Sequence, residues 1–263
     1  NHPPPIISHK FIKQTKPTII HNITLKSSLL GSIAAKLAGY KNVINAISGF
    51  GYNFTDDRNG ILQRIIRFLI KVSYKSKTFH FILQNPDDLN TIQNMQLVPR
   101  LNTHLIKGSG IDLNKFGYKS ITLPKDKLRF LFPARLLYDK GIVELINAAN
   151  LLKSKLKGKV EFILAGDFDS DNLASIKENE LKSFLIPGYI SWIGYQNNMY
   201  SVYVESDVVV LPSYREGLPK SLIEACAVGR PIVTTDVPGC RECVIDKVNG
   251  CLIEVKNSLN LAN

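Results

Sequence analysis

Short apolar runs alternate with longer amphipathic runs along nearly the whole chain. The runs at 128–133, 160–165 and 207–211 are apolar on both faces, as expected of parallel strands covered by helices. Predicted strands are 18–21, 42–47, 79–83, 103–107, 128–133, 160–165, 189–193, 207–211, 231–235 and 251–255. Predicted helices are 27–38, 61–75, 87–95, 141–156, 170–185, 198–205 and 219–228. The alternation predicts an α/β fold built from βαβ units with parallel sheets.

The periodicity is interrupted once, over residues 112–127, which include Pro124 and several lysines. We interpret this segment as a domain linker. A length of 263 residues suits two domains. The sequence therefore predicts a first Rossmann-like domain over 1–120 and a second over 121–263.

Charge is distributed unevenly between these two parts. The chain carries 33 Lys and Arg against 22 Asp and Glu, but residues 1–125 hold 17 of the former and 5 of the latter. This basic part suits an anionic partner such as a phosphate, a nucleic acid or an anionic membrane. It contains no aromatic-interleaved motif typical of RNA or DNA binding, which disfavours a nucleic-acid partner. The apolar runs are too short to predict a transmembrane helix.

The four cysteines include one C-x-x-C pair, Cys240 and Cys243. Cys226 and Cys251 do not supply the second pair that a zinc site needs. We expect reduced, mostly buried thiols in a cytoplasmic protein and no bound metal.

Ligands of open parallel sheets bind beyond the carboxyl ends of the strands, so the residues that follow each strand carry the chemistry. Arg135 and Lys140 follow the strand at 128–133, where a diphosphate would lie, and cations there would stabilise charge on a departing diphosphate without a metal. Glu216 and Glu224 follow the strand at 207–211. Each of these residues taken alone is more often a solvated surface residue. Their shared place at one sheet edge is what favours a site.

The loop before the helix at 219–228 is suited to an anion. Gly217, Leu218 and Pro219 allow backbone N–H groups to approach a ligand, and Pro219 fits the first turn of a helix. The helix N-terminus adds partial positive charge. Glu216 can reach across the ligand, and Glu224 can accept hydrogen bonds from a polyol such as ribose.

These segments resemble the retaining glycosyltransferases of family 4, which have the two-domain GT-B fold. The run FPARLLYDKG at 132–141 is similar to the G-R-L-x-x-x-K-G segment of that family, and Glu216 and Glu224 match its paired glutamates with seven residues between them. Further matching segments are 164–167, 231–239, Glu242 and 249–250. By this resemblance the first domain is incomplete, the C-terminal helices are missing, and part of the acceptor site is absent.

The first part of the chain is similar to members that build bacterial surface polysaccharides and lipid-linked oligosaccharides. The similarity covers 16–22 and 31–39, and 48–52 resembles a subgroup that adds N-acetylhexosamine to lipid-diphosphate acceptors. Ser48 stands where many members have a histidine. His21 resembles the histidine of other members, although a buried histidine at a strand end is an equal interpretation.

The resemblance implies a role for each matching residue. Arg135 and Lys140 would bind the donor diphosphate, Glu216 would hold the donor sugar, and Glu224 would bind the ribose. These are joined by further substrate-binding residues, namely Gly217, Leu218, Pro219, Lys220, Ser221, Ile193, Gly194, Gly166 and His21. Ile193 and Gly194 would flank the base.

The implied activity is transfer of a hexose or N-acetylhexosamine from a nucleotide-diphosphate sugar, with UDP expected. The acceptor would be lipid-linked or a polysaccharide, and transfer would proceed with retention and without a metal or cofactor. The expected location is the cytoplasm, at the inner face of the plasma membrane. A UDP-sugar epimerase with the same layout and a basic nucleic-acid-binding protein are the alternatives.

The helix predicted at 61–75 carries a stripe of four cations, Arg64, Arg67, Lys71 and Lys75. Its apolar positions are Ile65, Ile66, Phe68, Leu69 and Val72. This pattern is typical of a helix lying on an anionic lipid surface. It is equally typical of a domain helix whose apolar face packs on the sheet while its basic face is solvated.

Overall fold

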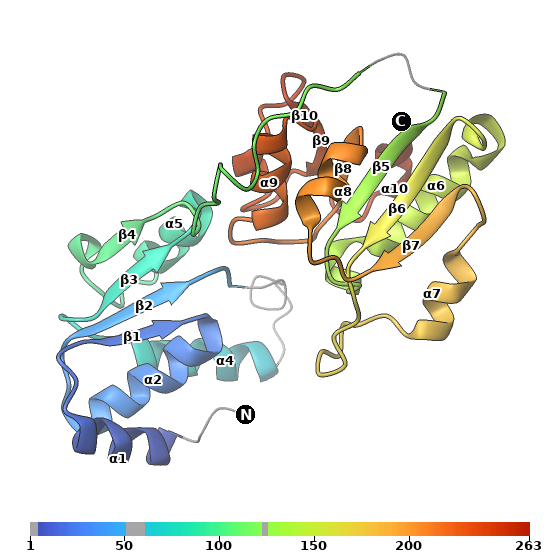
Figure 1. Ribbon diagram of the computed structural model, residues 1–263. Helices are drawn as coiled ribbons and strands as arrows, with labels where there is room; N and C mark the ends of the chain where they lie inside the picture. Colours follow the sequence, from blue (N-terminus) through green and yellow to red (C-terminus); the bar gives the residue numbers. More distant parts are fainter. Residues whose placement is uncertain (1–4, 51–60, 123–125) are drawn as a thin grey trace. The chain divides into compact units, whose positions relative to one another are not determined.

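The computed structural model describes residues 5–50, 61–122 and 126–263 (Figure 1). The chain forms two compact units. The smaller unit comprises residues 1–109 with 216–218, and the larger unit comprises 110–215 with 219–263.

The smaller unit is built on a parallel sheet of four strands in chain order. The strands are β1 (Ile20–Ile23), β2 (Val43–Ile47), β3 (His80–Leu83) and β4 (Thr103–Leu105). The helices are α1 (Pro5–Thr15), α2 (Leu25–Ala38), α4 (Ile61–Tyr74), α5 (Pro86–Asn94) and the 3-10 turn η1 (Arg100–Asn102). Right-handed crossovers between neighbouring strands put α2, α4 and α5 on the same face of the sheet. Val43, Ile47, Phe81 and Leu83 are buried and form its core.

Helix ends in this unit follow local sequence signals. Gly39 ends α2 in the left-handed conformation at φ 77°, which glycine adopts without steric cost. The Asn85 side chain accepts a 2.8 Å hydrogen bond from the Asp88 N–H at the start of α5, and Pro86 occupies the first turn.

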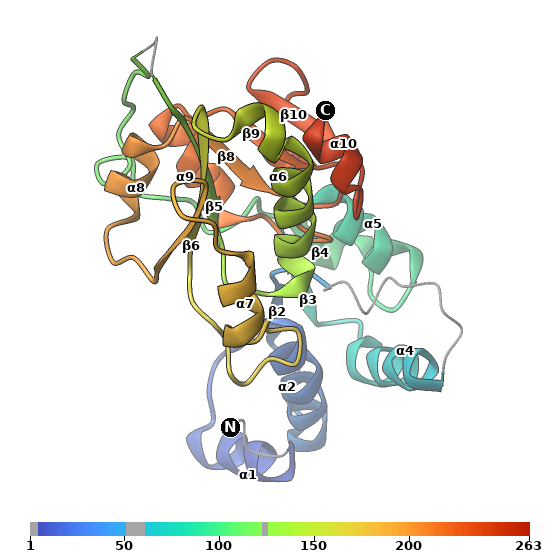
Figure 2. The same cartoon turned by 90° about the vertical axis from the view of Figure 1, so that its right-hand side faces the viewer.

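The larger unit contains a parallel sheet of six strands in the order β10-β9-β8-β5-β6-β7 (Figure 1), and helices α6 and α8 lie on opposite sides of it (Figure 2). The strands are β5 (Leu128–Pro133), β6 (Val160–Ala165), β7 (Ile190–Gly194), β8 (Val208–Leu211), β9 (Ile232–Thr235) and β10 (Gly250–Ile253). The helices are η2 (Tyr138–Lys140), α6 (Ile142–Leu156), α7 (Glu178–Phe184), α8 (Met199–Glu205), α9 (Lys220–Val228), η3 (Arg241–Cys243) and α10 (Ser258–Ala262).

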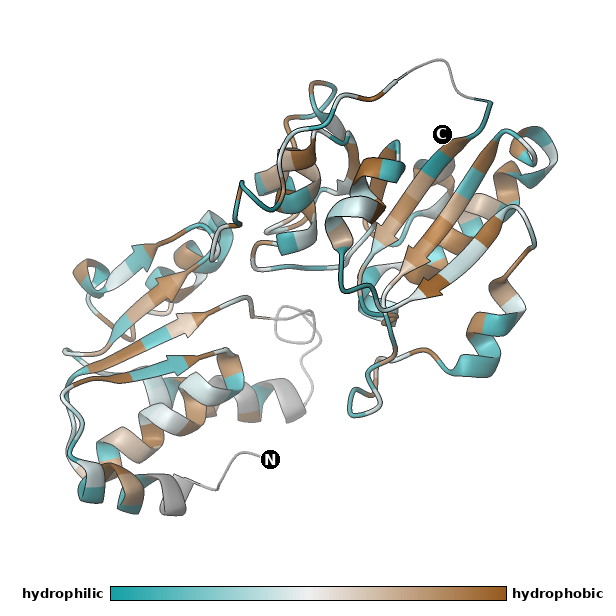
Figure 3. Ribbon diagram, in the orientation of Figure 1, coloured by the Kyte–Doolittle hydropathy of each residue, from teal (hydrophilic) through white to brown (hydrophobic). Residues whose placement is uncertain are grey.

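The strand order makes this sheet doubly wound. From β5 the chain adds β6 and β7 on one side, then returns and adds β8, β9 and β10 on the other. Right-handed crossovers therefore place α6 and α7 on one face and α8 and α9 on the opposite face. The central strands are strongly apolar (Figure 3), and Leu131, Leu164 and Val209 have no exposed surface. The predicted α/β fold with parallel sheets is confirmed.

The helix predicted at 170–185 is wrong in its first half, because only Glu178–Phe184 is helical. The Asn172 side chain accepts a 2.9 Å hydrogen bond from the Ala174 N–H, and Ser175 Oγ accepts one of 3.1 Å from the Asp169 N–H. Such side-chain hydrogen bonds satisfy the backbone in a turn and compete with helix formation. The sequence also gave no signal for α1 or α10.

The segment interpreted as a linker packs onto the larger unit over much of its length. Phe116 is buried, with ring centroids 6.5 Å from Tyr200 and 6.2 Å from Tyr203. The Arg230 guanidinium donates to the Lys119 carbonyl, and the Lys119 N–H donates to Val228 at 3.2 Å. Residues from Gly110 onward therefore belong to the larger unit.

The four cysteines are free thiols. Cys240 is buried and Cys243 is half-buried, but Cys226 and Cys251 are exposed. The expected burial is therefore wrong for two of the four.

Candidate functional site

A hollow of about 350 Å³ lies in the larger unit at the carboxyl ends of β5, β6 and β7. It adjoins the point where the sheet reverses its winding direction, which is where doubly wound sheets bind ligands. Its lining comes from the ends of β5 and β6, from the loops after these three strands and from helices α8 and α9, and comprises Pro133, Ala134, Arg135, Ala165, Gly166, Asp167, Phe168, Tyr195, Gln196, Met199, Tyr203, Ser221 and Glu224.

Two glycines let the loops around this hollow pack backbone against backbone. A Cβ on Gly166, at φ 154°, would lie 1.9 Å from the Ala134 carbonyl oxygen. A Cβ on Gly141, at φ 77°, would lie 2.0 Å from the carbonyl oxygen of Pro212. Any other residue at either position would push apart the loops that follow β5, β6 and β8.

The single tryptophan of the chain, Trp192 on β7, contacts the loop after β6. Trp192 Nε1 donates a 2.8 Å hydrogen bond to the Gly166 carbonyl. Its ring lies edge-on to Phe168, with centroids 5.4 Å apart. Because Gly166 and Phe168 both line the hollow, Trp192 fixes part of its wall.

Arg135 brings a positive charge into the lining from the loop after β5. Its guanidinium forms an ion pair with Asp169, and the Arg135 side chain remains 58% exposed. Exposed ion pairs contribute little to stability, so an anionic ligand can exchange with Asp169 at small cost.

Glu224 supplies a carboxylate from α9, and only 12% of its side chain is exposed. Tyr203 Oη lies 3.1 Å from Glu224 Oε2 and 3.0 Å from the Ser221 carbonyl oxygen, so its single hydroxyl hydrogen is shared between these two acceptors. Burial raises the pKa of the Glu224 carboxyl, and this is opposed by the Tyr203 hydrogen bond and by the charges of Lys220 and Lys115. Lys220 Nζ is 3.9 Å from Oε1.

Tyr203 is a lining residue that the sequence reasoning missed. It is fully buried, and burial together with Glu224 raises the pKa of its hydroxyl well above the usual value. In the sequence a tyrosine on a short helix cannot be distinguished from a core residue. Tyr195, Gln196 and Phe168 were also missed, although each follows a predicted strand end.

Nine of the thirteen predicted residues do not line this hollow. Lys140 ends η2 and is half-buried. Ile193 lines a different hollow, together with Arg129 and Ser201. Gly194 adopts a φ of 71° and accepts a 2.9 Å hydrogen bond from the Gly166 N–H, so it supports the loop from behind.

The remaining predicted residues lie in two places. Glu216, Gly217 and Leu218 follow β8 in the chain and are grouped with the smaller unit, while Pro219 precedes α9 and accepts a 3.0 Å hydrogen bond from the Leu222 N–H. His21 lies on β1, in register with Ile44, and is exposed. Its exposure excludes the interpretation of His21 as a core residue.

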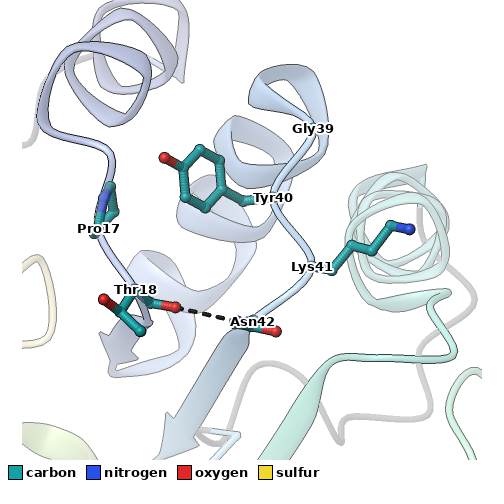
Figure 4. A pocket seen from close by; sticks show the side chains of 6 residues that line it. All are labelled: Pro17, Thr18, Gly39, Tyr40, Lys41 and Asn42. Carbon is teal, nitrogen blue, oxygen red and sulfur yellow. Dashed lines mark hydrogen bonds between the residues drawn. The ribbon is translucent and has the colours of Figure 1, made fainter.

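A third hollow lies in the smaller unit and is lined by Pro17, Thr18, Gly39, Tyr40, Lys41 and Asn42 (Figure 4). The Asn42 side-chain amide donates a 3.2 Å hydrogen bond to the Thr18 carbonyl across it. These residues precede β1 and β2, so this hollow lies at the amino ends of the strands. Parallel sheets bind ligands at the opposite edge, and the hollow in the larger unit is therefore the candidate site.

The sequence profile of one protein family, glycosyl transferases group 1, matches residues 117–263. The chain belongs to this family. A second profile, glycosyl transferase 4-like, matches residues 8–85. The glycosyltransferase resemblance drawn from the motifs is thus confirmed.

Several curated relatives match almost the whole chain, and two of them illustrate the similarity. One is the N,N'-diacetylbacillosaminyl-diphospho-undecaprenol alpha-1,3-N-acetylgalactosaminyltransferase of Campylobacter jejuni, 29% identical, covering 96% of this chain and 68% of that protein. The other is the UDP-Gal:alpha-D-GlcNAc-diphosphoundecaprenol alpha-1,3-galactosyltransferase of Escherichia coli, 27% identical, covering 95% of this chain and 65% of that protein. The chain spans about two thirds of the length of these relatives.

Solved structures show the same fold. Anabaena HepE in complex with UDP and glucose has a TM-score of 0.74 at 20% identity, covering 97% of this chain and 69% of that one. A sucrose-phosphate synthase from Thermosynechococcus elongatus has a TM-score of 0.76 at 20% identity, covering 97% and 65%. Within the described ranges, no helix is long and apolar enough to span a membrane.

Proposed function

We propose that the protein transfers a hexose or N-acetylhexosamine from a UDP-sugar to a lipid-diphosphate-linked or polysaccharide acceptor, with retention and without a metal, at the cytoplasmic face of a membrane. The observation that carries the proposal is the hollow beside the winding reversal of the larger sheet. It combines one guanidinium, Arg135, with one largely buried carboxylate, Glu224.

A nucleoside diphosphate has an anionic part and a polyol part, and the hollow offers a group for each. Arg135 can exchange Asp169 for a diphosphate oxygen, and the N-terminus of α9 adds partial positive charge. Glu224 Oε2 is held by Tyr203, which leaves Oε1 to accept a ribose hydroxyl. The HepE complexes with UDP and UDP-glucose and the UDP-Gal donor in the name of the Escherichia coli relative support a UDP-sugar donor.

The acceptor class follows from the relatives. The names of both curated proteins describe sugars attached to diphospho-undecaprenol. We assign to Glu216 the donor sugar, to Lys140 the diphosphate beside Arg135, and to Gly217, Leu218, Pro219 and Lys220 contacts to sugar and phosphate. Cations at the leaving diphosphate would stabilise its developing charge.

Calorimetry with UDP tests the donor site. We expect Arg135→Ala and Lys140→Ala each to weaken UDP binding and slow transfer, by on the order of 100-fold. Lys155→Ala, an exposed change on α6, is the matched control and should bind UDP as the wild type does. Unchanged UDP affinity in both site variants would show that the diphosphate assignment is wrong.

A transfer assay tests the reaction itself. UDP-sugars are incubated with an undecaprenyl-diphosphate-linked N-acetylhexosamine, with and without a chelator, and the anomeric configuration of the product is read by NMR. We expect retained configuration, no chelator effect, and loss of most transfer in Glu216→Gln with a modest loss of UDP binding. An inverted product contradicts retention, and an epimerised UDP-sugar contradicts transferase function.

A further inference from the structure

Helix α4 exposes four apolar side chains. Ile65 is 50% exposed, Phe68 63%, Leu69 40% and Val72 46%. They follow one another at helical spacing, so they form a continuous strip, which we call the α4 strip. The interpretation in which this apolar face packs on the sheet is therefore wrong for these four residues; the side chains of Ile66 and Arg67 lie outside the described residues.

The opposite side of α4 is fixed to the rest of the smaller unit. Ile70, Ser73 and Tyr74 are buried, and the Tyr74 hydroxyl hydrogen-bonds to Ser28 on α2. Lys36 of α2 donates to the carbonyls of Val72 and Lys75, at 2.5 Å and 2.9 Å, at the end of α4. These contacts set the rotation of the helix about its axis, so the outward direction of the α4 strip is built into the fold.

A row of cations runs along one side of the α4 strip. Arg64, Lys71 and Lys75 are exposed and stand at spacings of seven and four, which keeps them on one side of the helix. No Asp or Glu occurs in the described helices α1, α2 and α4, so no acid of these three helices offsets the row. Helix α2 contacts both α1 and α4, so these three helices form one layer whose charged residues are all basic.

We infer that the α4 strip docks on an anionic lipid bilayer, with its apolar side chains inserted at the boundary between headgroups and acyl chains and its cations against lipid phosphates. A helix with one apolar strip and adjacent lysines and arginines binds such a surface through both contributions. The absence of acids from the layer favours a uniformly anionic partner over a protein surface of mixed charge. The inference rests on the proposed function in one respect, because a lipid-linked acceptor requires the enzyme to work at a membrane.

Vesicle co-sedimentation tests the docking surface. Vesicles of phosphatidylcholine alone and of phosphatidylcholine with about 30% phosphatidylglycerol contain neither donor nor acceptor. We expect the chain to bind the anionic vesicles, to bind the neutral ones weakly, and to lose binding at high salt.

Two triple variants separate the apolar and the charged contributions. Ile65→Ser with Phe68→Ser and Val72→Ser removes the apolar strip. We expect vesicle binding to become at least tenfold weaker, because the three apolar side chains would no longer be buried in the bilayer. Its control changes three exposed apolar residues of the larger unit, Leu173, Ile245 and Val248, to Ser.

Arg64→Glu with Lys71→Glu and Lys75→Glu reverses the cation row. At about fivefold per cation near an anionic surface, we expect a loss of 100-fold or more. Lys155, Lys157 and Lys159, exposed in the larger unit, changed to Glu give the same net charge and serve as the control.

UDP affinity, measured on every preparation, shows that the larger unit is folded and separates the two claims. The docking inference is overturned if both α4 variants still bind vesicles, or if the wild type does not bind them. UDP binding in the same preparations would then still support the proposed function. Vesicle binding without UDP binding contradicts the proposed function and leaves the α4 strip as a lipid surface. A dimer in solution that the serine variant dissociates would assign the strip to a second copy of the chain and overturn the inference.

Discussion

The two units use the same βαβ construction, yet they direct their helices differently. In the larger unit, α6 buries Ile142, Leu145 and Ile146 against the sheet. In the smaller unit, α4 exposes its apolar strip. Both helices are amphipathic in sequence, so amphipathicity alone does not show which face is covered by protein. The contacts that fix the helix, here those of Lys36 and Tyr74, decide it.

Charge separates the units in the same way. The larger unit pairs its cations with acids, as in Lys127 with Glu161 and Lys182 with Glu178. The helical layer of the smaller unit has no acid in α1, α2 or α4. Local pairing suits a unit that binds one small ligand at a defined place, whereas an uncompensated field suits attraction to an extended anionic surface.

The largest expected effect comes from breaking the loop packing of the larger unit. Gly166→Ala would place a Cβ 1.9 Å from the Ala134 carbonyl oxygen, so we expect a loss of about 2–4 kcal/mol in the free energy of unfolding and loss of UDP binding. Urea unfolding followed by circular dichroism and calorimetry measure the two. Gly117→Ala, with its nearest contact at an ordinary 3.8 Å, is the control. A Gly166→Ala protein that binds UDP normally would contradict the role given to these loops.

A smaller effect is expected from loosening α4 in the other unit. Lys36→Met removes the hydrogen bonds to the Val72 and Lys75 carbonyls, and since Lys36 is exposed we expect only about 1 kcal/mol. Hydrogen exchange should accelerate in α4 while UDP affinity stays unchanged. Lys41→Met, also exposed, is the control. Exchange that is unchanged in α4 would show that Lys36 does not hold the helix.

The smallest effect concerns the pH dependence of stability. Because burial raises the pKa of Glu224 in the folded state, the folded protein binds this proton more tightly than the unfolded chain. The resulting stabilisation is fully present at a pH below the pKa that Glu224 has in the unfolded chain. It is lost as the pH rises through the pKa that Glu224 has in the folded protein. Glu224→Gln should therefore gain stability relative to the wild type as the pH rises through the range in which the Glu224 carboxyl ionises.

Chemical denaturation at each pH measures that difference. Asp171→Asn, a change at an exposed loop carboxylate, is the control and should show no such trend. A relative stability of Glu224→Gln that falls as the pH rises would contradict the direction of the shift.

The sequence predicted the strands of the larger unit to within two residues at each end, because strands that are apolar on both faces have few alternatives. The sequence could not show which residues at the end of β7 face the hollow. Ile193 was predicted to line it, but the lining residues there are Tyr195 and Gln196, which follow β7. Tyr203 escaped for a related reason, since its contact with Glu224 joins α8 to α9 and depends on packing. The bounds of α4 were readable from periodicity, but the exposure of its apolar strip follows from tertiary contacts.

The indole of Trp192 donates a hydrogen bond to the Gly166 carbonyl at the wall of the hollow. The chain therefore has one tryptophan fluorophore, and it lies in the larger unit. We expect its emission to change when a ligand bound in the hollow stiffens or shifts the loop after β6, which the indole contacts. The smaller unit contains no tryptophan, so we expect vesicle binding through α4 to leave the tryptophan emission spectrum unchanged. Under the proposed function, tryptophan fluorescence would therefore report binding of the donor and would not respond to binding of the bilayer.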